Sequence, residues 1–196
     1  MADRERDRLI KDVGTLKAIA HPLRMTLYRA LTIARTATAS QLAEQVDEAV
    51  SLVSYHLRKL AEHGLIEEAE PQSADGRERW WQPASDGVSI RDEDFRDAPE
   101  KAAAHTAASR LFFEQRADMY RRYLDERAHW SDAWTTASES SEWLLKLTPA
   151  ELSELAKEMH ALVRRYEERG RAADAAGGTE GRENVAVHTY GFPFRL

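Results

Sequence analysis

Two short amphipathic segments joined by a tight connection constrain the fold of this chain more than any other feature. The first spans about residues 39–46 and begins with Thr38 and Gln41, at the spacing of a capping box in which the hydroxyl caps the helix and the glutamine reaches back. The second spans about residues 50–63, and its apolar residues recur at i, i+4 and i+7, on one helical face. The pattern predicts two consecutive helices, the second of which buries Val53, Leu57 and Leu60.

The segments on either side extend this pair into a recognisable order of elements. Two further helices are predicted before it, over about residues 5–19 and 22–33. After it, Gly64 suits the end of a helix because glycine tolerates positive φ. Extended runs then flank an Asp75-Gly76 turn signal, which indicates a hairpin. Helix, helix, turn, helix, hairpin is the order of a winged helix-turn-helix.

The rest of the chain predicts a separate C-terminal part. Residues 86–98 are polar and are interpreted as a linker between a domain at 1–85 and a second domain at 99–196. We expect a long helix from Pro99 to about residue 130, and a second helix from Pro149 to Gly170 with Thr148 as its cap. Alternating apolar residues predict strands at 138–147 and 184–190.

The fold class is therefore mainly α, a winged helix-turn-helix with a C-terminal helical (α+β) extension. The second predicted domain has two candidate roles. Its amphipathic helices favour dimerisation, because a palindromic DNA site requires a two-fold assembly. The alternative is an effector pocket, although aromatic residues at helical spacing more often form a core. Its candidate lining is Phe112, Tyr120, Trp130, Trp134 and Trp143.

Charge and composition exclude several classes of function. The chain has a net charge of −6 and no cysteine, which excludes disulfides, thiolate metal sites and cysteine nucleophiles. We expect no membrane span, no secretory signal and a cytoplasmic location. Residues 1–85 hold 12 basic and 13 acidic residues, so the excess acid lies mostly in the remainder. This balance argues against nonspecific coating of DNA but allows a focused basic face.

Residues 41–46 and 51–66 resemble the ArsR family of winged-helix regulators, and residues 53–60 are the most specific part. Residues 20–24 also look like the opening of that family's second helix, and the resemblance covers about residues 15–83. It implies a homodimer that binds double-stranded DNA and regulates transcription, usually as a repressor. The sequence departs from the family at the turn 47–49, Asp-Glu-Ala, which lacks the usual serine cap and places two carboxylates near the helix.

The candidate DNA-binding residues lie on the second helix of the pair and on the hairpin. A recognition helix presents small polar residues to base edges, and arginine can pair with phosphate or guanine. The hairpin arginines are expected to reach the minor groove or the backbone, and the alternative is that they are solvated surface charges. The predicted DNA-binding residues are Gln41, Ser51, Leu52, Ser54, Tyr55, His56, Arg58, Lys59, Arg77 and Arg79.

Other classes of function find less support. Trp80 and Trp81 are interpreted as packing residues of the hairpin. The histidines are scattered without metal-ligand spacing, so no metal and no cofactor are expected. No phosphate-binding glycine loop or catalytic arrangement of Ser, His and Asp is recognisable, so an enzyme is not expected. The alternative to a DNA reader is a winged helix that binds proteins.

Overall fold

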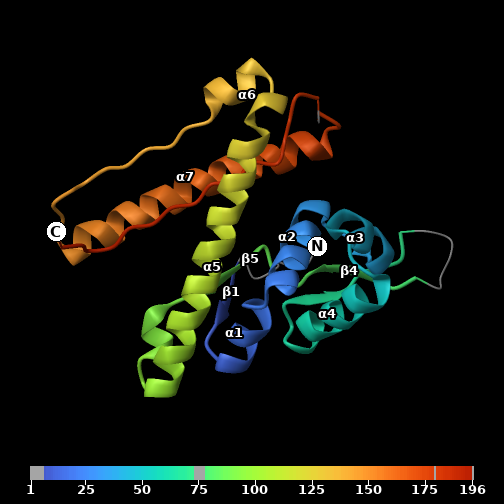
Figure 1. The fold of residues 1–196 in the computed structure, drawn as a ribbon, viewed down its shortest axis with the longest axis horizontal. Coiled ribbons are helices and arrows are strands. Elements are labelled where there is room, and N and C mark those ends of the chain that lie inside the picture. Colours follow the sequence, from blue (N-terminus) through green and yellow to red (C-terminus); the bar gives the residue numbers. More distant parts are fainter. Residues whose placement is uncertain (1–6, 73–77, 179, 196) are drawn as a thin grey trace. The chain divides into compact units, whose positions relative to one another are not determined.

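The computed structural model describes residues 7–72, 78–178 and 180–195, which fall into two compact units, Met1–Asp125 and Glu126–Leu196 (Figure 1). The first unit holds a winged helix-turn-helix and the long helix that follows it. Its elements are β1 (Asp7–Ile10), α1 (Val13–Ile19), α2 (Pro22–Ala34), β2 (Ala37–Thr38), α3 (Ala39–Val46), α4 (Val50–Glu62), β3 (Ile66–Glu68), β4 (Trp80–Pro83), β5 (Gly87–Ile90), η1 (Asp92–Phe95) and α5 (Pro99–Glu126).

The helix-turn-helix pair forms as the sequence predicts. Thr38 accepts a hydrogen bond from the backbone N–H of Gln41, and Gln41 Oε1 accepts one from the N–H of Thr38, so the capping box of α3 is complete. The turn to α4 begins at Asp47, which has a left-handed φ of 54°. Gly64 follows α4 at a φ of 62°, where a side chain would be strained.

The predicted hairpin is confirmed, and it belongs to a three-stranded antiparallel sheet of order β2-β4-β3. Glu67 pairs with Gln82 across the hairpin, and Ala37 pairs with Trp81 on its other side. The short strand β2 directly precedes α3, so its hydrogen bonds with β4 hold the hairpin next to the helix-turn-helix pair. The predicted Asp75-Gly76 turn and Arg77 lie outside the described residues.

A single apolar core lies among α1, α2, α3, α4 and the hairpin. The inward positions predicted on α4 are all fully buried, as are the corresponding leucines of α2 and α3. Burial of such side chains contributes about 1.5–3 kcal/mol each relative to exposure. The largest members of this core, which also include residues of β1 and η1, are Ile10, Leu16, Ile19, Leu27, Leu31, Leu42, Val53, Leu57, Leu60, Leu65, Ile66 and Phe95.

Two predictions for the first unit were wrong. The helix expected at 5–19 is split, because Asp12 caps α1 by accepting a hydrogen bond of 2.7 Å from the N–H of Thr15. The residues before it form β1, which pairs in parallel with β5. The segment 86–98 is consequently more than a linker: it contains β5 and η1, and Phe95 is fully buried. The many polar residues of this segment predicted a linker, but its one aromatic residue, Phe95, packs in the core.

The long helix α5 belongs to the first unit, although the sequence assigned it to a C-terminal domain. Ala108 of α5 is buried in the core and Phe112 packs against it. Arg29 of α2 also donates a hydrogen bond of 3.3 Å to Gln115. These contacts explain why the division of the chain falls after α5 and not before it.

The second unit is helical, with η2 (Arg127–His129), α6 (Asp132–Ala137) and α7 (Pro149–Ala175). The capping box of α7 is confirmed, since Thr148 and Glu151 exchange hydrogen bonds. The helix continues past Gly170, because that glycine has no positive φ, and it ends before Gly177, which has a φ of 76°. No helix in the described part of the chain is long and apolar enough to cross a bilayer.

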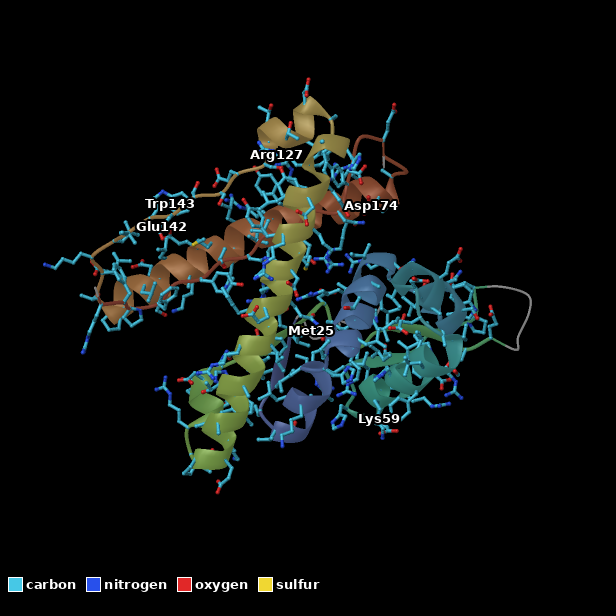
Figure 2. The ribbon with its side chains drawn as sticks, in the orientation of Figure 1. Met25, Lys59, Arg127, Glu142, Trp143 and Asp174 are labelled. Atoms are coloured by element: carbon cyan, nitrogen blue, oxygen red, sulfur yellow. The ribbon has the colours of Figure 1, made fainter. Side chains whose placement is uncertain are left out.

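The prediction of strands at 138–147 and 184–190 was wrong. Among the described residues of this unit neither segment pairs in a sheet, so the extension has no β component there. Both run as extended chain along α7 (Figure 1), and Trp143 lies on the first of them (Figure 2). Alternation predicts an extended conformation correctly, but a strand also requires a hydrogen-bonded neighbour.

The buried face of α4 supplies the first testable prediction. Leu57→Ala should lower the free energy of unfolding by about 2–5 kcal/mol, because it opens a cavity in a fully packed core. Leu52→Ala is the matched control on the same helix, since Leu52 is 40% exposed, and it should change stability by less than about 0.5 kcal/mol. Urea unfolding followed by circular dichroism measures both, and equal losses would contradict the assigned faces of α4.

Candidate nucleic-acid interface

One side of α4 is exposed, and it is the side on which the sequence predicted DNA contacts. Ser51, Leu52, Tyr55 and Arg58 are exposed, whereas Ser54 is half-buried. Leu52 and Tyr55 retain 40% and 47% of their surface, and Val50 in the first turn of the same helix retains 46%. An exposed apolar and aromatic surface of this kind indicates an interaction site.

Three predicted residues meet in a hollow of about 280 Å³ where α3, α4 and the hairpin converge. Ser54 and Arg58 enter it from α4, and Arg79 enters it from the hairpin. The sequence analysis did not single out several other residues of this hollow. Ser40 and Val50 are two of these, and their signal was their position in the first turns of α3 and α4. Glu78 also lines the hollow from the hairpin, together with Trp81, which the sequence predicted as a packing residue.

Arg79 holds its position on the hairpin through two surface contacts. Its Nε lies 3.1 Å from Glu68 Oε1, and its guanidinium carbon lies 5.6 Å from the centre of the Trp81 ring. The side chains of Arg79 and Glu68 are more than half exposed, so this ion pair is worth little in water. An arginine held so weakly can exchange its carboxylate partner for a phosphate.

Lys59 and Gln41 are engaged within the domain. Lys59 Nζ lies 2.7 Å from Glu62 Oε2 and 5.9 Å from the centre of the Tyr55 ring, at the outer edge of α4 (Figure 2). The contact with Glu62 raises the pKa of the Lys59 ammonium. Gln41 is exposed, but its side-chain oxygen is committed to the cap of α3.

His56 is the predicted site residue that the structure turns inward. Only 6% of its surface is exposed, and its ring centre lies 4.6 Å from that of His21 on α2. The exposed face of α4 therefore passes through Tyr55 and Arg58, and His56 is not available for the direct base contact that the sequence suggested. Position 56 lies three residues after Val53 and four residues before Leu60, so the helical period places it on the same inward face.

Arg24 fixes His56 and connects three helices. Its guanidinium donates to the carbonyls of Lys17, at 3.1 Å, and Ala18, at the end of α1. Its Nη1 lies 3.5 Å from His56 Nδ1, which must be unprotonated to accept this hydrogen bond. The cation also suits the carbonyl end of α1. This arrangement positions the recognition helix against α1 and α2.

The surroundings of both histidines disfavour their protonated forms. Burial, reinforced by Arg24, lowers the pKa of His21, and burial, reinforced by His21 and Arg24, lowers the pKa of His56. His21 Nδ1 is buried without a hydrogen-bond partner among the described residues. Protonation of either ring would place a second cation beside Arg24.

The turn between α3 and α4 exposes the carboxylates of Asp47 and Glu48. The N-cap of α4 is Ala49, which provides no side-chain hydrogen bond. The first N–H groups of α4 are therefore available to water or to an anion. The two carboxylates oppose an anion at this end, while Arg58 and Arg79 lie on the part of the surface nearer the hairpin.

The predicted effector residues are divided between the two units. Phe112 packs against the core, and Tyr120 stacks on Tyr123 in the first unit. In the second unit the rings of Trp130 and Trp134 meet edge to face at 6.4 Å, and Trp143 is 68% exposed. A hollow of about 420 Å³ beside α5 involves none of these five and is lined by Asp92, His105, Thr106, Ser109, Arg110, Phe113 and Glu114.

Comparison with known proteins gives a family match for the helix-turn-helix part of the chain. Residues 19–69 match the family model described as a helix-turn-helix domain, which agrees with the ArsR-like resemblance of the motif on α4. The class that the fold and this match define is therefore a helix-turn-helix domain with the hairpin as its wing. No curated protein matches the chain.

Solved structures of regulators are also similar to this chain. Reduced HlyU from Vibrio cholerae is 20% identical, over 52% of this chain and 88% of that chain, with a TM-score of 0.33. A possible transcriptional regulator for arsenical resistance is 26% identical, over 58% of this chain and 95% of that chain, with a TM-score of 0.32. Scores this low do not establish a common overall fold, so the class rests on the helix-turn-helix match and on the geometry of α3, α4 and the hairpin.

The buried histidines predict that stability falls in acid. Their folded-state pKa values lie below the unfolded value of about 6.5, so the unfolded chain binds more protons and stability declines as the pH falls below about 6.5. His56→Gln should flatten this dependence between about pH 7.5 and pH 5. Urea unfolding across that range measures it, with His129→Gln on an exposed residue as the control. A stability that rises in acid would contradict the arrangement.

Proposed function

We propose that this protein is a homodimeric transcription regulator that inserts α4 into the major groove of a palindromic operator and represses by occluding the promoter. The observation that carries the proposal is the exposed face of α4, on which Ser51, Tyr55 and Arg58 lie together beside Arg79 of the hairpin. Helix-turn-helix domains place the second helix of the pair in the major groove, with its N-terminal part toward the bases.

Each exposed side chain has a contact suited to its chemistry. Ser51 and Ser54 can donate to or accept from base edges, and Leu52 can contact a thymine methyl group. Arg58 can bind guanine through two hydrogen bonds, and it forms no ion pair with any described residue that would compete. Tyr55 is placed by its contact with His56, whose ring centre is 5.1 Å away.

The hairpin is proposed to reach the DNA backbone or the minor groove through Arg79, with Arg77 as a second contact from the sequence. Arg79 and Lys59 are both held by exposed carboxylates, Glu68 and Glu62. Exchange of such surface pairs for phosphate costs little and releases counterions from the DNA. This supports phosphate binding in a chain of net charge −6.

The remaining features agree with a specific reader of DNA. The carboxylates of Asp47 and Glu48 repel phosphate, which disfavours binding to arbitrary DNA and leaves affinity dependent on base contacts. A protein-binding winged helix is the alternative, and it would use the same exposed Leu52 and Tyr55 without a requirement for Arg58. We propose a cytoplasmic location and no catalytic role. Control by a small-molecule effector is a second proposal, for which the candidate residues are Phe112, Tyr120, Trp130, Trp134 and Trp143.

Removal of the Arg58 side chain tests the proposed function. Arg58→Ala should weaken binding to the selected operator by about 1–3 kcal/mol and relax the preference at the base that it contacts. Arg96→Ala is a matched control, because Arg96 is exposed in the same unit but lies outside α4 and the hairpin. Fluorescence anisotropy at a fixed salt concentration measures both. An Arg58 variant that binds like the wild type would remove α4 from the proposed interface and favour the protein-binding alternative.

A further inference from the structure

The helix α7 has no buried side chain, although it is long and carries an apolar stripe. Leu162, Val163 and Tyr166 keep 46%, 42% and 62% of their surface exposed. Leu152, Leu155 and Met159 are only half-buried, and Leu152 lies against the extended C-terminal segment at Gly191. A helix in a protein gains most of its stability from the packing of such an apolar face, and an isolated helix is only marginally stable, so α7 requires a partner.

One edge of α7 carries a pair of acidic residues in its first half and a pair of basic residues in its second half. Glu154 and Glu158 are four residues apart in the N-terminal half, and Arg165 and Arg169 are four residues apart in the C-terminal half. Like charges at this spacing face each other and destabilise an isolated helix. None of the four forms an ion pair with a described residue, although Arg169 lies 4.9 Å from the centre of the Tyr166 ring.

The helix dipole does not account for this division. It favours acidic residues in the first turn and basic residues in the last turn, and its effect fades within one turn. Glu158 and Arg165 both lie farther than one turn from the ends at Pro149 and Ala175. Their placement instead brackets the exposed Leu162, which is the midpoint of α7.

We infer that α7 pairs with the α7 of a second copy of this chain, antiparallel about a two-fold axis near Leu162. A two-fold axis there places the glutamate pair of each helix beside the arginine pair of the other. The exposed apolar residues then meet at the centre. Such a surface is complementary to itself, which is the requirement for an isologous contact. The charges also exclude the parallel arrangement, in which acid would face acid and base would face base.

This inference rests on the proposed homodimer and gives that dimer a defined contact. Helical periodicity places Glu154, Glu158, Arg165 and Arg169 along one edge of the stripe that carries Leu162. The same edge therefore presents acid, an apolar centre and base in that order. A second copy is favoured over an unrelated partner because one helix supplies both halves of the charge pattern.

A charge-exchange experiment in the full chain tests the contact. One variant carries Glu154→Lys and Glu158→Lys, and the other carries Arg165→Glu and Arg169→Glu. Each variant alone brings like charges together at both ends of the contact, so its dimer dissociation constant should rise about tenfold or more in low salt. A mixture of the two restores opposite charges at both ends and should form a heterodimer. Sedimentation equilibrium at about 50 mM salt, with one variant labelled, measures all three samples.

The control exchanges Lys157→Glu and Glu168→Lys on the opposite side of α7, which leaves the net charge unchanged and should leave the dimer unchanged. Failure of the mixture to restore association would overturn the inference, as would two variants that associate like the wild type. In the latter case a dimer that still binds the operator would show that another surface makes it, and the proposed function would stand. A wild-type chain that sediments at 22.3 kDa at micromolar concentration would instead refute the homodimer itself.

Discussion

The packing of α4 against the core is the constraint on which the rest of the molecule depends. Val53, Leu57 and Leu60 are fully buried, and this fixes the rotation of the helix about its own axis. The same rotation exposes Ser51, Leu52, Tyr55 and Arg58, because α4 packs against the core with only one of its faces. The hydrophobic effect thus selects the surface that is proposed to contact DNA. The hairpin and β2 then bring Arg79 to the same surface through the shared sheet.

A second set of contacts, which is polar, holds the inward side of α4. Arg24 connects the last carbonyls of α1 to His56 of α4. Burial lowers the pKa of both neighbouring histidines, and the positive charge of Arg24 lowers it further. A buried polar group of this kind must be satisfied, so its geometry is more specific than apolar packing alone. The position of the exposed face of α4 is consequently set by the buried apolar face of the same helix and by Arg24.

The sequence predicted the parts whose signals are local. The capping boxes at Thr38 and Thr148, the inward stripe of α4 and the hairpin were all readable from spacing. The errors have tertiary causes. His56 turns inward because it contacts Arg24 and His21, which come from another part of the chain. Phe95 is buried in a core formed by residues distant in the sequence, although the segment around it is polar. Likewise the segments 138–147 and 184–190 alternate like strands, yet pairing depends on a neighbour that spacing cannot reveal.

The central claim is that α4 reads base sequence in a two-fold assembly. Selection of bound DNA from a random pool, followed by sequencing, tests it most directly. The account predicts enrichment of two inverted half-sites with centres about 10–10.5 base pairs apart, or a multiple of that spacing, as two symmetric recognition helices require. Recovery of no preferred sequence, or of a single half-site without its inverted repeat, would contradict it.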